Sequence, residues 1–242
     1  MNTKSDKAID WLKLSVEGAV IVASILLAFA LQAWWDDRRD TITEQEMLVA
    51  LQSELQGALD MLDNQLSLME LQATSSMGLA DTMREAGEGE IATVNSHDVA
   101  TMFNYATYDP PFGIAGALLD SGQASILSNA ELRAALGRWP AAIADAVEDQ
   151  ILLERMGMER IGPLVQRSII NMKPVYTSNI EEQLNRDSSF AILDSESEIV
   201  ASRELWNVLY QRHTRTLVAM GDLGRARQQL LQLIDLVDGE LE

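Results

Sequence analysis

The chain has 242 residues and is strongly acidic, with 37 Asp and Glu against 18 Lys and Arg and a formal net charge of −19. A surface of this charge repels polyanions, which argues against nucleic acid as a partner. The 47% apolar content suffices for one substantial core, and the absence of cysteine excludes disulfides and thiol nucleophiles.

The most apolar stretch runs from Gly18 to Trp35 and contains no charged residue. At about 1.5 Å per helical residue, it spans roughly 27 Å, close to the hydrocarbon core of a bilayer of about 30 Å. Three tryptophans lie where aromatic side chains are enriched at membrane interfaces: Trp11, Trp34 and Trp35. The sequence therefore predicts a transmembrane helix over residues 14–35, preceded by a short tail over residues 1–13.

A cleavable signal peptide is the alternative to an anchor. Ala28-Phe29-Ala30 has the pattern of a cleavage site, and three lysines precede the apolar stretch. The stretch continues beyond that site to Trp35, however, and Glu17 lies where a signal peptide is already uncharged. Both features favour an anchor that stays on the protein.

The positive charges on the two flanks predict the orientation of the anchor. Lys4, Lys7 and Lys13 precede it, whereas Arg38 and Arg39 follow it closely. Cytoplasmic flanks of membrane helices are enriched in Lys and Arg. The sequence therefore favours a cytoplasmic N-terminus and places residues 36–242 outside the cytoplasm.

One face of the predicted anchor carries mostly polar or small side chains at helical spacing: Glu17, Ile21, Ser24, Ala28 and Gln32. Such faces of membrane helices usually contact protein rather than lipid. We expect this face to pack against a second helix, from another copy of the chain or from a second membrane protein. Two alternatives remain for Glu17. In the first it lies at the headgroup level without a partner, and in the second it takes part in proton coupling.

Residues 36–242 are expected to form one acidic helical domain. Apolar residues recur at steps of three and four from Leu48 to Met69, which is one stripe over about six helical turns. No proline intervenes before the Gly87–Glu90 turn, so a helix is expected over residues 41–86, either separate from the anchor or continuous with it. Further helices are expected over residues 97–106, 112–121, 129–169 and 202–237.

The two later long helices each carry an apolar stripe. The stripe of the helix over 129–169 comprises Leu132, Leu136, Ile143, Val147, Ile151, Leu152 and Met156. That of the last helix comprises Leu205, Val208, Leu209, Leu217, Met220, Leu223, Leu230, Leu231, Ile234 and Val237. Bends are expected at Pro140 and Gly162-Pro163. Residues 171–200 are expected to form a connection with one short helix, Ile180–Arg186, and no segment shows the alternation of a strand. An all-α bundle is the expected fold.

No residue pattern in the chain points to catalysis or to a cofactor. His97 and His213 lie far apart, and no carboxylate spacing joins them into a metal site. The stretch Asp194–Glu198 alternates acidic and serine side chains but lacks the glycine turn of a calcium loop. The glycines near Gly116 are not followed by the Lys-Ser/Thr of a phosphate loop. We therefore expect a non-enzymatic protein without metal or cofactor.

A corner between two helices is expected near residue 125. Ser121-Gly122 is expected to end one helix, and Ser128-Asn129 to cap the next, with Glu131 and Arg133 in its first turn. A packed structural corner is the first interpretation. A ligand or partner pocket at this corner is the alternative.

Two stretches resemble a known family. The first is LLAFALQAWWDDRRD at the end of the predicted anchor, followed by a charged helix with Glu46, Leu48, Leu51, Glu54 and Leu55. The second is LLDSGQASILSNAELRAAL, from Leu118 to Leu136. Both resemble a bacterial family of single-span proteins catalogued as domain of unknown function sixty-ninety. The resemblance implies an anchored helical domain in the inner membrane and brings no known activity.

The sequence as a whole favours a membrane-anchored helical scaffold or accessory subunit. Its expected partners are the lipid bilayer and either a second copy of the chain or another membrane protein. The alternative is a sensor, in which the outer bundle binds a small ligand and signals through a partner. A partner is required because the tail before the anchor is too short to be a signalling domain.

Overall fold

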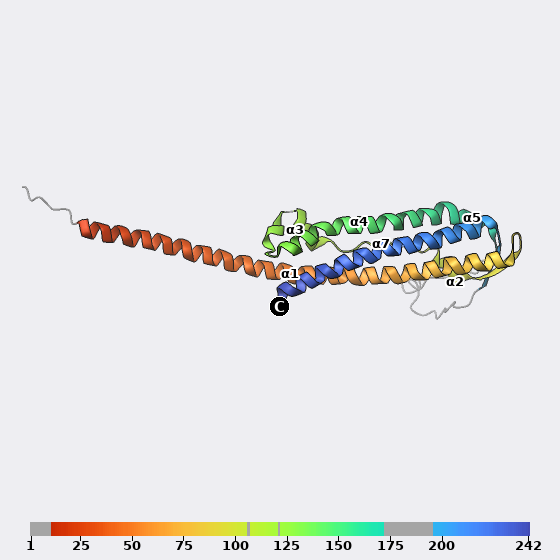
Figure 1. Ribbon diagram of the computed structural model, residues 1–242, viewed down its shortest axis with the longest axis horizontal. Helices are drawn as coiled ribbons and strands as arrows, with labels where there is room; N and C mark the ends of the chain where they lie inside the picture. The colour runs from red at the N-terminus through yellow and green to blue at the C-terminus, as the bar shows by residue number, and fades with distance from the viewer. Residues whose placement is uncertain (1–10, 106, 121, 172–195) are drawn as a thin grey trace, which may run out of the picture.

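The computed structural model describes residues 11–105, 107–120, 122–171 and 196–242. Three long helices run side by side, and one of them, α1, projects far beyond the other two (Figure 1). The predicted helical bundle is confirmed, with one addition, a small three-stranded sheet.

Helix α1 is a single helix of 76 residues, Trp11–Ala86, and is about 114 Å long at 1.5 Å per residue. The predicted anchor and the first bundle helix are therefore one continuous rod. The predicted stripe is buried from Leu48 onward, apart from the half-buried Leu66. The helix ends at Gly87, whose φ of +96° is the left-handed conformation common after a helix, and whose N–H donates to the Met83 carbonyl at 3.2 Å.

The next helix, α2 (Ser96–Thr101), is shorter than the predicted 97–106. Its cap is Asn95, whose side chain accepts from the His97 N–H at 2.8 Å, and not the adjacent Ser96. The Ser96 hydroxyl is instead buried, 2.6 Å from the Ser197 hydroxyl. Helix α3 (Gly113–Asp120) and a 3₁₀ turn, η1 (Gln123–Ile126), follow.

The connection between α2 and α3 bridges two long helices at Tyr108. The Tyr108 N–H donates to the side-chain oxygen of Gln150 in α4 at 2.7 Å, and its hydroxyl donates to the Ala58 carbonyl of α1 at 3.2 Å. Burial raises the pKa of this hydroxyl, because the phenolate is disfavoured away from water. A non-helical segment thus links α1 to α4, and it occupies the place that a fourth helix takes in a four-helix bundle.

The predicted helix over 129–169 consists of three successive segments, α4 (Ala130–Met156), a π-helical turn η2 (Gly157–Ile161) and α5 (Gly162–Ser168). Pro140 lies inside α4, which continues through it. The irregular turn precedes Gly162. At Gly157 a β-carbon would collide with the Tyr105 hydroxyl oxygen, so only glycine allows the Tyr105 ring to pack there.

Helix α7 (Arg203–Leu241) is capped by Ser202, whose hydroxyl accepts from the Leu205 N–H at 3.2 Å. It packs against both α1 and α4. Most of its predicted stripe is buried, but the expectation for Leu217 was wrong, because this side chain is 50% exposed. Ile151 and Leu152 of α4 were also expected to be buried and are exposed. All three belong to the outer surface of the α4–α7 pair.

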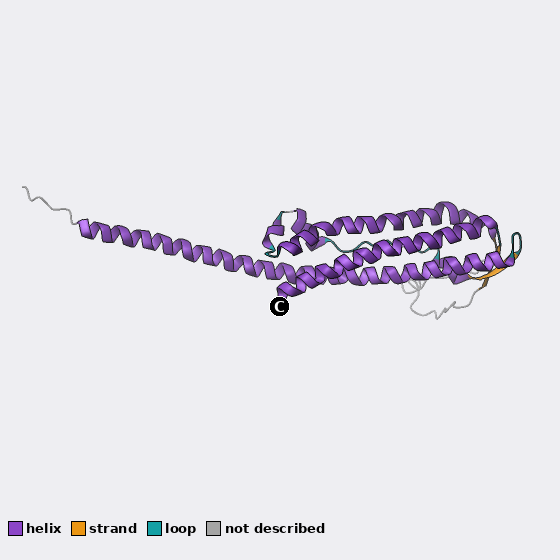
Figure 2. Cartoon of the chain, in the orientation of Figure 1, coloured by secondary structure: helices purple, strands orange, loops and turns teal. Residues whose placement is uncertain are grey.

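The sheet contradicts the expectation that the chain has no strands. It consists of β1 (Ile91–Asn95), β2 (Ile169–Asn171) and β3 (Glu196–Val200), in the order β1-β3-β2 with both pairs antiparallel. Figure 2 shows the strands at the end of the bundle away from the projecting part of α1. The expected helix Ile180–Arg186 lies outside the described residues.

The bundle core has two apolar parts. One is built around Leu48–Met69 of α1 and Ala219–Val237 of α7, and the other lies near the sheet, around Leu79–Met83 and Leu205–Leu209. Between them lie buried polar side chains that we call the polar belt: Gln65, Gln72, Ser75, Ser76, Gln150, Arg212 and Thr216.

Candidate functional site

The projecting part of α1 is the largest exposed apolar feature of the described chain. Every described side chain from Glu17 to Asp40 is exposed, including Leu26 at 62% and Phe29 at 66%. Exposed apolar area of this extent marks a membrane or protein contact in a natural protein. The helix is long and apolar enough to cross a membrane, which is consistent with the predicted anchor and does not by itself establish it.

The five residues of the predicted anchor interface all lie exposed on α1: Glu17, Ile21, Ser24, Ala28 and Gln32. We call them the small face. No other described element covers them. The Ser24 hydroxyl donates to the Val20 carbonyl at 2.7 Å, so its hydrogen bond is made within the helix. Ser24 therefore offers a neighbouring helix a small surface rather than a free donor.

The predicted interfacial tryptophans belong to α1. Trp34 and Trp35 are 61% and 66% exposed, and their rings meet edge to face with centroids 6.3 Å apart. Trp11 is the first residue of the helix. After Trp35, twelve mostly exposed and charged residues separate the apolar segment from Leu48, where burial begins. At 1.5 Å per residue this stalk holds the bundle about 18 Å from the apolar segment.

The predicted corner joins the start of α4 to α1 and α7. Asn129 caps α4, since its side-chain oxygen accepts from the Glu131 and Leu132 N–H groups at 2.8 and 3.0 Å. Its amide donates to Glu240 near the end of α7 at 2.7 Å, and the Ser128 N–H donates to Glu44 of α1.

The rest of the corner is held by backbone geometry and one arginine. The Arg133 guanidinium donates to the Leu127 and Ser128 carbonyls. Gly122 has a φ of +70°, the left-handed conformation that favours glycine. Ser121 lies outside the described residues. The bonds of the corner tie the start of α4 to α1 and to the end of α7, so the first interpretation, a structural corner, accounts for the residues named.

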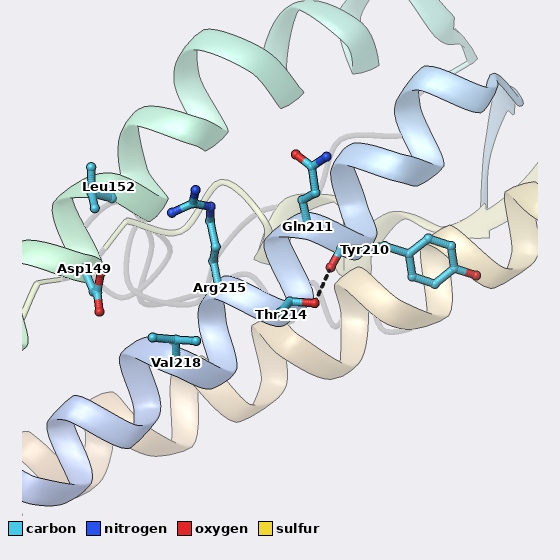
Figure 3. A pocket seen from close by; sticks show the side chains of 7 residues that line it. All are labelled: Asp149, Leu152, Tyr210, Gln211, Thr214, Arg215 and Val218. Atoms are coloured by element: carbon cyan, nitrogen blue, oxygen red, sulfur yellow. Dashed lines mark hydrogen bonds between the residues drawn. The ribbon is translucent and has the colours of Figure 1, made fainter.

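A groove runs along the outer surface between α4 and α7 (Figure 3). Its cavity of about 520 Å³ is lined by Asp149, Leu152, Tyr210, Gln211, Thr214, Arg215 and Val218. Arg215 extends from α7 towards α4, whereas the Tyr210 ring points towards α1, where its hydroxyl donates to Asp81 at 2.6 Å. A second hollow of about 190 Å³ shares Leu152 and Arg215.

The groove is bordered by exposed apolar side chains. Ile151, Leu152, Leu217 and Val218 are between 38% and 57% exposed. Three of them belong to the stripes that the sequence assigned to the core. The apolar pattern of α4 and α7 is thus wider than the surface that the described part of the bundle covers.

The polar belt holds a small cavity near its centre, of about 20 Å³. Arg212 and Gln150 line it from α7 and α4, and Tyr105 lines it from the connection after α2. Burial lowers the pKa of the Arg212 guanidinium and raises the pKa of the Tyr105 hydroxyl, because the charged form of each loses hydration. This site was not predicted from the sequence, since Arg212 looks like an ordinary polar position of a surface helix.

The two histidines lie apart, as their spacing suggested. His97 is exposed in α2, and a ring nitrogen of His213 lies 2.9 Å from the Ala73 carbonyl. Glu196–Glu198 of the acidic stretch belong to β3, and Asp194 and Ser195 lie outside the described residues. Among the described residues, no three His, Asp or Glu side chains gather to hold a metal ion.

Comparisons with known proteins add no relative. No family model, no curated protein and no solved structure matches the chain. The family resemblance therefore stays a prediction, and the function rests on the geometry above.

Proposed function

We propose that the chain is a non-enzymatic, membrane-anchored scaffold or accessory subunit that pairs with a second copy through the small face of α1. Its N-terminus lies in the cytoplasm, and residues 36–242 lie outside the cytoplasm of a bacterial cell. The observation that supports this function is the continuity of α1, which carries an exposed apolar segment directly into the core of the bundle.

The angular positions of the small face and of the buried stripe around α1 support pairing without a clash between the two bundles. At about 100° per residue, Leu48, Leu55 and Leu62 lie about 200–240° around the helix from Ser24. The bundle therefore packs on the side of the rod roughly opposite to the small face. Two α1 rods in contact through their small faces would carry their bundles on the outside.

Three of the five large apolar side chains that are exposed on α1 beyond the anchor agree with this phase. Ile42, Val49 and Leu71 are 49%, 55% and 43% exposed, and all lie within about 20° of Ser24 around the ideal helix. The face that pairs in the membrane thus continues along the rod outside it.

Cysteine cross-linking in native membranes tests the proposal, because the chain has no cysteine of its own. Ser24→Cys places a thiol on the small face, and Leu26→Cys places one about 200° around the same helix, at the same depth. A disulfide needs Cα atoms about 4.4–6.8 Å apart, so only a close helix pair forms it. Oxidation should convert most of the Ser24→Cys protein into a dimer and little of the Leu26→Cys protein.

Equal cross-linking of the two variants would refute the small face as the interface, and absence of any dimer would refute pairing of copies. The anchor is tested separately in the same membranes. Extraction at alkaline pH should leave the chain in the pellet with residue 1 retained. Release into the supernatant would overturn anchoring itself.

The α4–α7 groove favours a second candidate function, a sensor that binds a small ligand and signals through a partner. Its volume of about 520 Å³ falls in the range of small-molecule sites, about 300–1,000 Å³. Leu152→Trp fills the groove from an exposed position. A small molecule that raises the Tm of the native chain but not of this variant would support the sensor, and a ligand screen without such a molecule would remove it.

A further inference from the structure

Arg212 is a buried cation without a carboxylate partner. Its side chain is 1% exposed, in the middle of the polar belt. Its Nη1 donates to the Leu153 carbonyl at 3.2 Å, and its Nε finds no hydrogen-bond partner. Among the described residues, no carboxylate oxygen lies within 4.0 Å of the guanidinium. An unpaired buried charge is strongly destabilising, so a counter-charge is expected beside it.

Two further buried polar atoms lack partners, and they line the same cavity as Arg212. They are Nε2 of Gln150 and the hydroxyl oxygen of Tyr105. Buried polar atoms in proteins are nearly always hydrogen-bonded, to protein, water or an ion. Three orphaned atoms around one cavity of about 20 Å³ point to a single occupant, because about 10–15 Å³ suffices for one water-sized particle.

The three unpartnered atoms of the lining can all donate a hydrogen bond to this occupant. The Tyr108 N–H donates to Oε1 of Gln150, which fixes the orientation of the amide and leaves its NH₂ group without a partner. Nε of Arg212 carries a hydrogen and cannot accept, and the Tyr105 hydroxyl can donate. A water molecule needs acceptors for its own two hydrogens, whereas an anion needs none. The donor set together with the unpaired positive charge therefore favours an anion.

We propose that the polar belt binds one small monovalent anion, chloride, between Arg212, Gln150 and Tyr105. The space in the cavity, about 20 Å³, suits a single small ion. Glu154 also lines it but forms no ion pair with the guanidinium. The bound ion neutralises Arg212 and joins α7, α4 and the connection after α2. The inference is independent of membrane anchoring and of pairing.

Thermal unfolding of the full chain in neutral detergent tests the proposal, with chloride replaced by gluconate at constant ionic strength. A ligand that binds only the folded state raises stability in proportion to the logarithm of its concentration. For a domain of this size, Tm should rise by about 3–5 °C for each tenfold increase in chloride above the dissociation constant.

Two arginine variants separate site binding from a general salt effect. Arg212→Met should abolish the chloride dependence, whereas Arg227→Met, at a half-buried arginine that is paired with Asp63, should retain it. Gln150→Leu removes one donor and should weaken chloride about tenfold, which keeps the test decisive if Arg212→Met does not fold. Bromide should give one anomalous peak in the cavity of crystals.

Two further results of these experiments would contradict the chloride site. A native Tm that does not respond to chloride would show that water occupies the cavity or that Glu154 turns to neutralise Arg212, and would overturn the proposal. An unchanged chloride response in Arg212→Met or Gln150→Leu would overturn it as well. Glu154→Gln should leave the chloride response unchanged, and a response that appears only in Glu154→Gln would assign the counter-charge of Arg212 to Glu154.

Discussion

Glu54 of α1 holds the start of α3 from outside that helix. Its two carboxylate oxygens accept from the Ile114 N–H at 2.7 Å and the Ala115 N–H at 2.9 Å. The first bond within α3 is that of the Gly116 N–H to the Phe112 carbonyl at 3.2 Å, so these two N–H groups have no partner inside the helix. A carboxylate here also interacts favourably with the positive end of the helix dipole.

Glu54→Gln is the sharpest perturbation of this contact, because it keeps the shape of the side chain and removes the charge. The amide retains one acceptor oxygen and turns an NH₂ group towards the other N–H, where two donors then meet. Hydrogen bonds to charged groups contribute about 1.5–3 kcal/mol each. Since Glu54 is only half-buried, we expect a loss of about 2 kcal/mol for the variant.

That loss should lower Tm by about 4–8 °C, given about 2–4 °C per kcal/mol for a domain of this size. The assay is thermal unfolding followed by circular dichroism, with Glu70→Gln on the exposed surface of the same helix as the matched control. Hydrogen exchange of the Ile114 and Ala115 amides should accelerate in Glu54→Gln alone. Equal Tm values for the two variants would refute the reasoning.

Two further predictions concern packing and pH. Gly157→Ala should destabilise the bundle by about 1–3 kcal/mol, because the new methyl group meets the Tyr105 ring. Gly137→Ala, whose methyl group enters open space, should stabilise the bundle by about 0.5–1 kcal/mol. Urea unfolding of both variants checks the sign of each change in stability. The Arg227 guanidinium donates to both carboxylate oxygens of Asp63 and holds the pKa of that carboxyl below its usual range. The small stability from this solvent-screened pair is therefore present at neutral pH and lost as the pH falls below about 4. Asp63→Asn should have a lower urea midpoint than the native chain at pH 7, and the difference should shrink at pH 3; a difference that grows would contradict the assignment.

The long helices could be predicted because their apolar residues recur over many turns. The stripe from Leu48 to Met69 identified the inner face of α1 correctly. In α7 the continuous inner face passes through Arg212, Thr216 and Ala219, two of which are polar. The apolar pattern of the sequence leaves the two polar residues out and includes Leu217 instead, which lies one position away from the inner face.

The strands and the polar belt could not be predicted, for related reasons. A strand of five residues is too short to show a reliable period, and β1 pairs with β3 across about a hundred residues of sequence. Arg212 is polar in sequence, and its burial depends on Gln150 and Tyr105, which come from other elements. Asn129 was predictable, in contrast, because a cap bonds to residues beside it in the sequence.

The proposed pairing face of α1 changes character along the rod, and on this proposal the change decides where association is strongest. Within the predicted anchor, Ser24 and Ala28 allow two backbones to approach closely. Beyond it, the exposed Ile42 and Val49 alternate with acidic residues such as Glu46 and Asp60, which repel their copies in a parallel pair. Apolar contact along the stalk therefore offsets charge repulsion only in part. On the proposed arrangement the membrane segment carries the association, and the two bundles stand apart with their α4–α7 grooves free for other partners.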